Sequence, residues 1–146
     1  MVRRIATDLR PAALDHRDLG GAIEDEARRV SARAGVPVVV SAHIDAPVHP
    51  DRAIVAFRIF QEALTNAVRH AEPHTISARV STRGNTLSLI VYDDGSGIPP
   101  DRLDAPESLG LLGMRERARS VGGTLRIRSG ERGTLVHLDL PSTERA

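Results

Sequence analysis

The sequence predicts an α/β sandwich, an α+β domain in which helices cover one face of a mixed, mostly antiparallel sheet. Pairs of strand-like segments joined by short turns alternate with helical segments along the chain. No glycine fingerprint follows the first predicted strand, which argues against a Rossmann fold. The chain has 146 residues, enough for one ordinary domain.

The first half of the chain is expected to form a helix, a strand and a second helix. One helix opens at Asp18 and stops at Gly35, because apolar residues recur between them at helical spacing. The run 36–44 is rich in β-branched residues and predicts a strand. A longer helix over 51–71 follows a proline-containing loop.

The second half predicts a hairpin, a helix and a second hairpin. Alternating polar and apolar residues mark four strands, and glycines mark the turns between them. A loop rich in glycine, proline, aspartate and serine precedes the helix, which ends at a pair of glycines. The segments are strands at 75–82 and 86–94, the loop at 95–110, the helix from 111 to Gly122, and strands at 124–129 and 134–141.

Two missing residue types exclude several kinds of site. The chain has no cysteine, which excludes disulfides, thiolate zinc sites and a cysteine nucleophile. It also has no lysine, because every basic residue counted is arginine. A Walker A loop, a eukaryotic-type protein kinase and Schiff-base chemistry all require lysine, so none of the three is expected.

The charge and aromatic content argue against nucleic acid as a partner. The formal net charge is +1, and only three residues are aromatic, so neither a strong basic field nor stacking platforms are present. No apolar run approaches the roughly 20 residues that span a bilayer. We therefore expect a cytoplasmic domain without direct membrane contact, whose parent protein could carry a membrane anchor.

The helix predicted over 51–71 carries an unusual set of polar groups. Glu62, Asn66, Arg69 and His70 fall between about 120° and 220° from Phe57 on a helical wheel. They therefore share the face opposite the apolar stripe. This pattern fits a functional face, and it equally fits an ordinary solvated face.

Two later loops contain glycines where a ligand could approach the backbone. Asp93 ends a strand, and Gly95 and Gly97 follow it, so the chain can turn tightly and pass close to a flat ligand. Gly110 and Gly113 lie at the start of the next helix, where free N–H groups favour phosphate. Each pattern taken singly is also common in plain turns.

Taken together and in this order, the motifs resemble the ATP-binding catalytic domain of bacterial sensor histidine kinases, which belongs to the Bergerat (GHKL) superfamily. The stretch "QEALTNAVRHA" is similar to the N box of that family, "DDGSG" to its G1 box, and "LGLLGMRERA" to its G2 region. The wording "GMRER" resembles the subfamily that pairs with NarL/LuxR-type response regulators. The resemblance covers most of the chain and implies the Bergerat fold.

The resemblance implies a role for each matching residue. Glu62 would orient or deprotonate the attacking histidine, and Asn66 would ligate Mg²⁺, which accepts one neutral amide readily. Asp93 would read the adenine amine. The remaining positions implied to bind ATP are Arg69, His70, Gly95, Gly97, Ile98, Leu109, Gly110, Leu111, Gly113, Met114 and Thr134.

One position departs from the family pattern. Ser108 stands where the G2 box usually has its first glycine. It lies near the end of 98–109, which would form the lid over the nucleotide. A serine there is expected to reshape the lid, without affecting the fold.

The resemblance also implies what lies outside these residues. Residues 1–17 would be the end of a dimerisation helix and its junction, and 18–146 the catalytic domain. His16 follows Pro11 between helices, so we do not expect it to be the phosphoacceptor. The acceptor histidine would lie on a dimerisation domain of the parent, which is expected to be a homodimer although the isolated chain is expected to be a monomer.

The predicted function is phosphoryl transfer from Mg-ATP to that histidine and then to a response regulator. An anti-sigma-type serine kinase shares the "EALTNAVRHA"-like helix and remains an alternative. A nucleotide-binding module without turnover is a second alternative, favoured by Ser108.

Overall fold

The computed structural model describes residues 10–15, 17–99 and 110–143. Within these ranges the helices and strands follow the predicted order. They are η1 (Ala12–Leu14), α2 (Leu19–Ala34), β1 (Val38–His43), α3 (Pro50–Asn66), η2 (Ala67–Ala71), β2 (Ile76–Arg83), β3 (Thr86–Asp93), α5 (Leu111–Ser120), β4 (Thr124–Gly130) and β5 (Gly133–Pro141). The helix expected at the start of the chain, His16, Ser108 and Leu109 lie outside the described residues.

The strands form one five-stranded sheet in the order β1-β2-β3-β5-β4. β1 and β2 are parallel, and the other three pairings are antiparallel. The predicted mixed, mostly antiparallel sheet is therefore confirmed. The sequence did not predict that β5 would lie between β3 and β4, since that order depends on contacts between distant segments.

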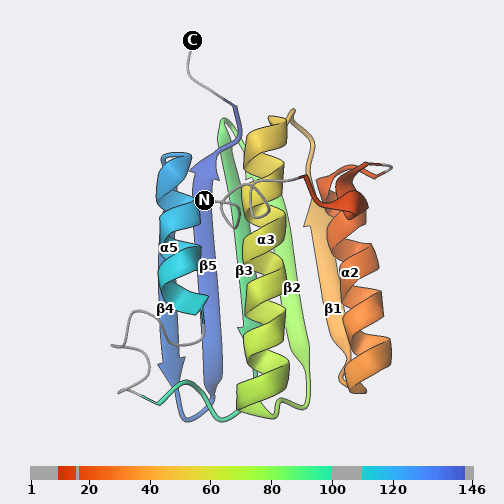
Figure 1. Ribbon diagram of the computed structural model, residues 1–146, viewed down its shortest axis with the longest axis vertical. Coiled ribbons are helices and arrows are strands. Elements are labelled where there is room, and N and C mark those ends of the chain that lie inside the picture. Colours follow the sequence, from red (N-terminus) through yellow and green to blue (C-terminus); the bar gives the residue numbers. More distant parts are fainter. Residues whose placement is uncertain (1–9, 16, 100–109, 144–146) are drawn as a thin grey trace, which may run out of the picture.

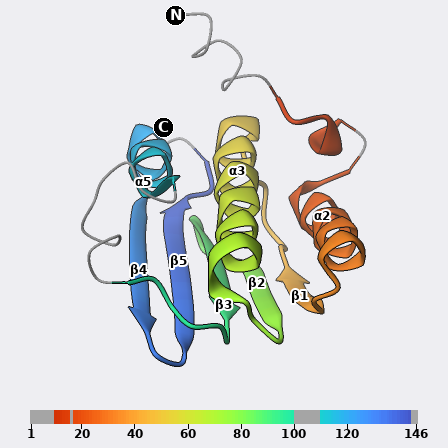
Figure 2. The same ribbon diagram turned by 60° about the horizontal axis from the view of Figure 1, so that its bottom comes forward.

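The long helices cover one face of this sheet. In Figure 1, α2 lies over β1, α3 over the middle of the sheet and α5 over its β4–β5 side; Figure 2 shows the three helices together on that face. Apolar side chains alternate along the strands, so every second residue points into the layer beneath the helices. Phe57 and Phe60 of α3 are fully buried there, in a core that is otherwise aliphatic.

Local signals explain where α2 and α3 begin. Asp18 accepts a hydrogen bond from the Gly21 N–H and caps α2, which ends at Gly35 in a left-handed conformation. The ring of His49 accepts the Asp51 N–H, and Pro50 occupies the first turn of α3.

The end of the helix predicted over 51–71 differs from expectation. The α-helix stops at Asn66, and residues 67–71 form a wider π-helical turn. The carbonyl of Ala71 accepts the Ser96 N–H at 2.8 Å, a contact with the loop after β3. A tertiary contact of this kind, formed where the helix ends, is not encoded in local helical spacing.

Candidate functional site

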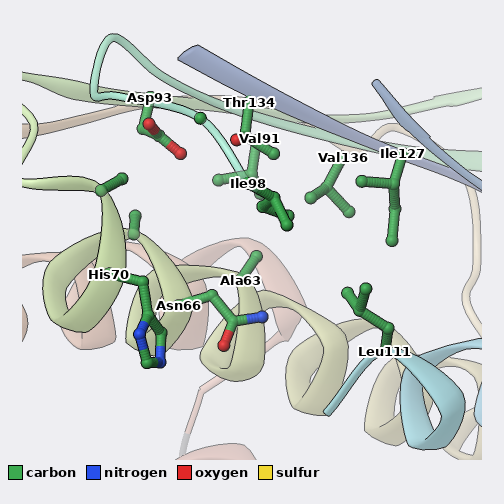
Figure 3. A pocket seen from close by; sticks show the side chains of 13 residues that line it. Ala63, Asn66, His70, Val91, Asp93, Ile98, Leu111, Ile127, Thr134 and Val136 are labelled. Atoms are coloured by element: carbon green, nitrogen blue, oxygen red, sulfur yellow. The ribbon is translucent and has the colours of Figure 1, made fainter. Parts of the chain in front are cut away.

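A cavity lies between the C-terminal end of α3, the π-helical turn and the strands β3, β5 and β4, with the start of α5 at one side. Its enclosed volume is about 20 Å³, room for a water molecule. Figure 3 shows side chains from the sheet facing those from α3 and from Leu111. It is lined by Ala63, Asn66, Ala67, His70, Ala71, Val91, Asp93, Gly97, Ile98, Leu111, Ile127, Thr134 and Val136.

Asp93 and Thr134 supply the polar side chains on the sheet side of the cavity. The two residues are direct partners in the antiparallel pairing of β3 with β5, and both are buried. Burial raises the pKa of the Asp93 carboxyl, and the backbone N–H of Gly95 opposes this effect by donating to Oδ1 at 2.9 Å. The cavity therefore has one acidic acceptor with a hydroxyl beside it.

The loop after β3 is held by Asp94. Its Oδ1 accepts the N–H groups of His74 and Thr75 at 2.7 and 2.9 Å. These bonds, led by that from Thr75, hold the pKa of the Asp94 carboxyl below its usual range. Asp94 thus ties the end of β3 to the start of β2 and leaves the preceding Asp93 facing the cavity.

Two glycines let the same loop pass close to neighbouring backbone. A Cβ on Gly95 would lie 2.2 Å from the carbonyl oxygen of Ala71. Gly97 has φ 82°, and a Cβ there would lie 2.1 Å from the carbonyl oxygen of Gly130. Both positions therefore require glycine, and the reason is close contact with the protein's own backbone.

The helix side of the cavity combines small and polar residues. Ala63, Ala67 and Ala71 are buried and leave the space beneath the sheet open. Asn66 and His70 lie one helical turn apart along the same wall (Figure 3). The Asn66 amide thus lies on the helix side of the cavity, whereas the His70 side chain is exposed and its ring points away from the sheet (Figure 3).

The four polar residues predicted to share one helix face do not line one space. Glu62 lies in a neighbouring groove with Arg58, Arg117 and the start of α5. Arg69 lies in a third groove, beside Arg33 of α2. Each groove is set by the element packed against that side of the helix, which a helical wheel does not contain.

The start of α5 divides its residues between two of these spaces. Leu111 is buried in the cavity, whereas Gly110, Gly113 and Met114 line the groove that contains Glu62. Gly110 has φ 69°, and a Cβ there would lie 2.2 Å from Oε1 of Glu62. Glycine at this position therefore allows the helix start to approach the carboxylate.

The match to a protein family decides what kind of domain this is. A model of the histidine kinase-, DNA gyrase B- and HSP90-like ATPases matches residues 51–144, which contain α3 except its first residue, the π-helical turn, β2 to β5 and α5. The chain belongs to this ATPase family. The match covers every residue that lines the cavity.

A relative of this ATPase-family chain is a histidine kinase. It is 36% identical over 142 residues to UhpB of Salmonella typhimurium, a signal transduction histidine-protein kinase/phosphatase. That alignment covers 96% of this chain but 28% of UhpB, so the chain spans under a third of its relative's length.

Solved structures agree on the fold. The blue-light activated histidine kinase of Erythrobacter litoralis EL346 superposes with a TM-score of 0.70 and 29% identity, over 85% of this chain and 42% of that one. The mycobacterial sensor histidine kinase MprB superposes with a TM-score of 0.62 at 20% identity, over 84% of this chain and 93% of that one. The latter likeness concerns the fold.

Ile98 and Leu111 of the cavity were predicted as site residues, whereas its apolar wall of Val91, Val136 and Ile127 was not. Val91 lies two residues before Asp93, and Val136 lies two residues after Thr134. Since side chains two apart on a strand share a face, the period of two identifies both once the polar residues are known. Ile127 of β4 carries no such local signal, because the pairing of β4 with β5 brings it there.

Neither a metal cluster nor a membrane-spanning helix occurs in the part of the chain that the structure describes. Among those residues, no three histidine, aspartate or glutamate side chains group closely enough to hold a metal ion. No helix in the described ranges is long and apolar enough to cross a bilayer.

Proposed function

We propose that this chain is the ATP-binding catalytic domain of a sensor histidine kinase and that the cavity beneath β3 and β5 takes the adenine of Mg-ATP. The observation that carries the proposal is the pairing of Asp93 with Thr134 inside an apolar cavity of a domain from this ATPase family. The carboxylate can accept from an exocyclic amine, and the aliphatic walls suit a flat purine.

The residues present fit the nucleotide in chemistry, and the walls would have to separate to admit it. The cavity holds about 20 Å³, much less than a purine ring occupies. Ile98, the first residue of the predicted lid, and Leu111, which follows that lid by two positions in the sequence, both line the cavity. We infer that nucleotide entry displaces these two side chains.

Asn66 is the proposed protein ligand of Mg²⁺. It lies on the cavity wall formed by α3, on the opposite side from Asp93 (Figure 3). Mg²⁺ keeps several waters and needs few protein oxygens, so one amide oxygen suffices. When bound, the ion would neutralise phosphate charge during transfer.

Glu62 is the proposed catalytic residue. It lies one helical turn before Asn66, the proposed Mg²⁺ ligand, and it lines a neighbouring groove and not the adenine cavity. In this position it would orient or deprotonate an incoming histidine. His70 and Gly97 are proposed to contact the nucleotide because they line the cavity, whereas Arg69 lies in a separate groove.

The partners follow from the same proposal. The acceptor histidine would come from the parent's dimerisation domain, for which residues 1–17 are proposed to be the junction. The phosphoryl group would then pass to a response regulator of the NarL/LuxR type, and the parent would act in the cytoplasm as a homodimer. The 36% identity to the kinase/phosphatase UhpB supports this assignment.

Calorimetry tests the nucleotide and magnesium roles. The chain is titrated with ATP with and without Mg²⁺, and Asn66→Asp is compared with Thr65→Asp. Thr65 is the adjacent residue and faces the groove against α2, so it controls for added charge. We expect Mg²⁺ to tighten ATP binding and Asn66→Asp to change that dependence by about tenfold, with Thr65→Asp behaving as wild type. Equal behaviour of the two variants would contradict the magnesium role.

Phosphoryl transfer is tested by adding a dimerisation domain that carries a phosphoacceptor histidine. The expected product is labile in acid, as a phosphohistidine is. An acid-stable phosphoserine on an added protein substrate would instead favour the serine-kinase alternative. Tight ATP binding without any transfer would favour the non-catalytic module.

A further inference from the structure

Ser129 of β4 connects two residues that line the cavity and does not line it itself. Its hydroxyl oxygen accepts the backbone N–H of Ile98, in the loop after β3. The same oxygen lies 3.0 Å from the hydroxyl of Thr134 on β5. Both Ile98 and Thr134 line the cavity, on its sheet side (Figure 3).

The position of Ser129 follows from strand pairing. Ser129 and Thr134 are direct partners in the β4–β5 hairpin, so their side chains point to the same face of the sheet. Ile127, two residues earlier, reaches the cavity on that face. The serine hydroxyl is therefore held next to the polar end of the cavity by the sheet itself.

A hydroxyl can make both contacts at once. It has one proton to donate and two lone pairs that accept, so it can accept from Ile98 and share a hydrogen bond with Thr134. One oxygen thus fixes the backbone at Ile98 and limits the rotation of the Thr134 hydroxyl. Loss of that oxygen would release both groups together.

The backbone around this link is closely packed. Gly97 precedes Ile98 and passes so near Gly130 that a Cβ would lie 2.1 Å from the Gly130 carbonyl oxygen. The loop after β3 is therefore pressed against the β4–β5 hairpin at the residue next to Ser129. This packing fixes the position of the Ile98 N–H relative to the Ser129 hydroxyl, which an isolated hydrogen bond at the surface would not do.

We propose that Ser129 is a positioning residue for nucleotide recognition, which sets Thr134 and Ile98 in the arrangement that distinguishes adenine from other bases. This inference rests on the proposed function, because it concerns the same cavity. Ser129 acts through Thr134 and Ile98 and is not itself a catalytic residue.

The test compares Ser129→Ala, Ser129→Thr and Ser88→Ala. Ser129→Thr keeps the hydroxyl, and Ser88→Ala removes a hydrogen-bonded strand hydroxyl from the opposite face of the sheet, where it contacts Asp139. Binding of ATP and of inosine triphosphate is measured by calorimetry. The second nucleotide has a carbonyl in place of the exocyclic amine, so the ratio of the two affinities reports base recognition. Amide hydrogen exchange at Ile98 is measured by NMR.

We expect Ser129→Ala to lower the preference for ATP over inosine triphosphate by about fivefold to tenfold and to speed exchange at Ile98 by about tenfold or more. Ser129→Thr should stay within about twofold of wild type because it keeps the hydroxyl, and Ser88→Ala should do so because the lost hydrogen bond lies on the opposite face of the sheet. A merely structural role would weaken both nucleotides equally and leave the ratio unchanged.

Three results would overturn the proposal: an unchanged nucleotide ratio in Ser129→Ala, unchanged exchange at Ile98, or a Ser129→Thr variant that behaves like Ser129→Ala. Failure of the wild-type chain to bind any nucleotide would overturn the proposed function. The two failures are distinguishable, because only the second is visible in the unmodified protein.

Discussion

Asp93 and Thr134 face each other across the β3–β5 pairing, and both side chains enter the same buried cavity. They are 41 positions apart in sequence and meet because β5 inserts between β3 and β4. A carboxylate kept in an apolar cavity is costly for the fold, and this cost suggests a role in binding.

Replacement of Asp93 by Asn should weaken ATP binding by about tenfold or more, since a charged acceptor for the adenine amine becomes a neutral amide. Calorimetry with Asp139→Asn as the control measures this effect, because Asp139 contacts Ser88 and His137 on the uncovered face of the same sheet. An affinity equal to that of wild type would remove Asp93 from the adenine site.

The same substitution should not lower stability at neutral pH. Burial raises the pKa of Asp93 above the ordinary value of 3.8, so the folded state binds the carboxyl proton more tightly than the unfolded state does. Its contribution to stability is complete below 3.8 and is lost as the pH rises through the raised pKa. At pH 7 the wild type therefore keeps an ionised carboxylate at a cost.

We expect Asp93→Asn to have an equal or higher free energy of unfolding than wild type at pH 7, with the difference shrinking as the pH falls toward 4. The amide oxygen of Asn can still accept the Gly95 N–H. Urea denaturation at several pH values measures the difference. A clear loss of stability at pH 7 would show that the carboxylate is needed for folding.

Gly97→Ala tests the close contact between the loop after β3 and the β4–β5 hairpin. Gly84→Ala is the matched control, because Gly84 has a similar positive φ of 59° but a Cβ there would meet no other atom within 4 Å. We expect Gly84→Ala to cost about 1 kcal/mol from backbone conformation. Gly97→Ala should cost about 3 kcal/mol because the Gly130 carbonyl must also move.

Urea denaturation of both variants gives the comparison, and ATP titration shows whether the displaced loop also weakens binding. Equal losses of stability would mean that the hairpin yields easily at Gly130. In that case the loop is less firmly held than its packing indicates.

Much of the fold could be predicted because its signals are local. Asp18 and Gly35 bound α2 as expected, and alternating residues marked β2 and β3 to within a residue or two. The sequence also indicated at which loop positions the backbone requires glycine. At Gly95 and Gly97 the sequence suggested close approach of a ligand, whereas the structure shows close approach of backbone.

The site was predicted less completely, because its parts are joined by long-range pairing. The helical wheel placed Glu62 and Arg69 with Asn66 and His70, yet they line three separate spaces. Ile127 could not be assigned to the cavity without knowing that β4 pairs with β5, which lies beside β3.

The sequence by itself determined which segments become helices and strands, and which residues carry chemistry that resembles an ATP site. The spacing of hydrophobic residues, the capping residues and the turn glycines act over a few positions, so they can be recognised in the sequence alone. Tertiary structure alone decided the strand order, the π-helical turn at 67–71 and the meeting of Asp93, Thr134 and Ser129. These depend on hydrogen bonds and packing between segments distant in sequence, whose pairing is chosen by the whole core.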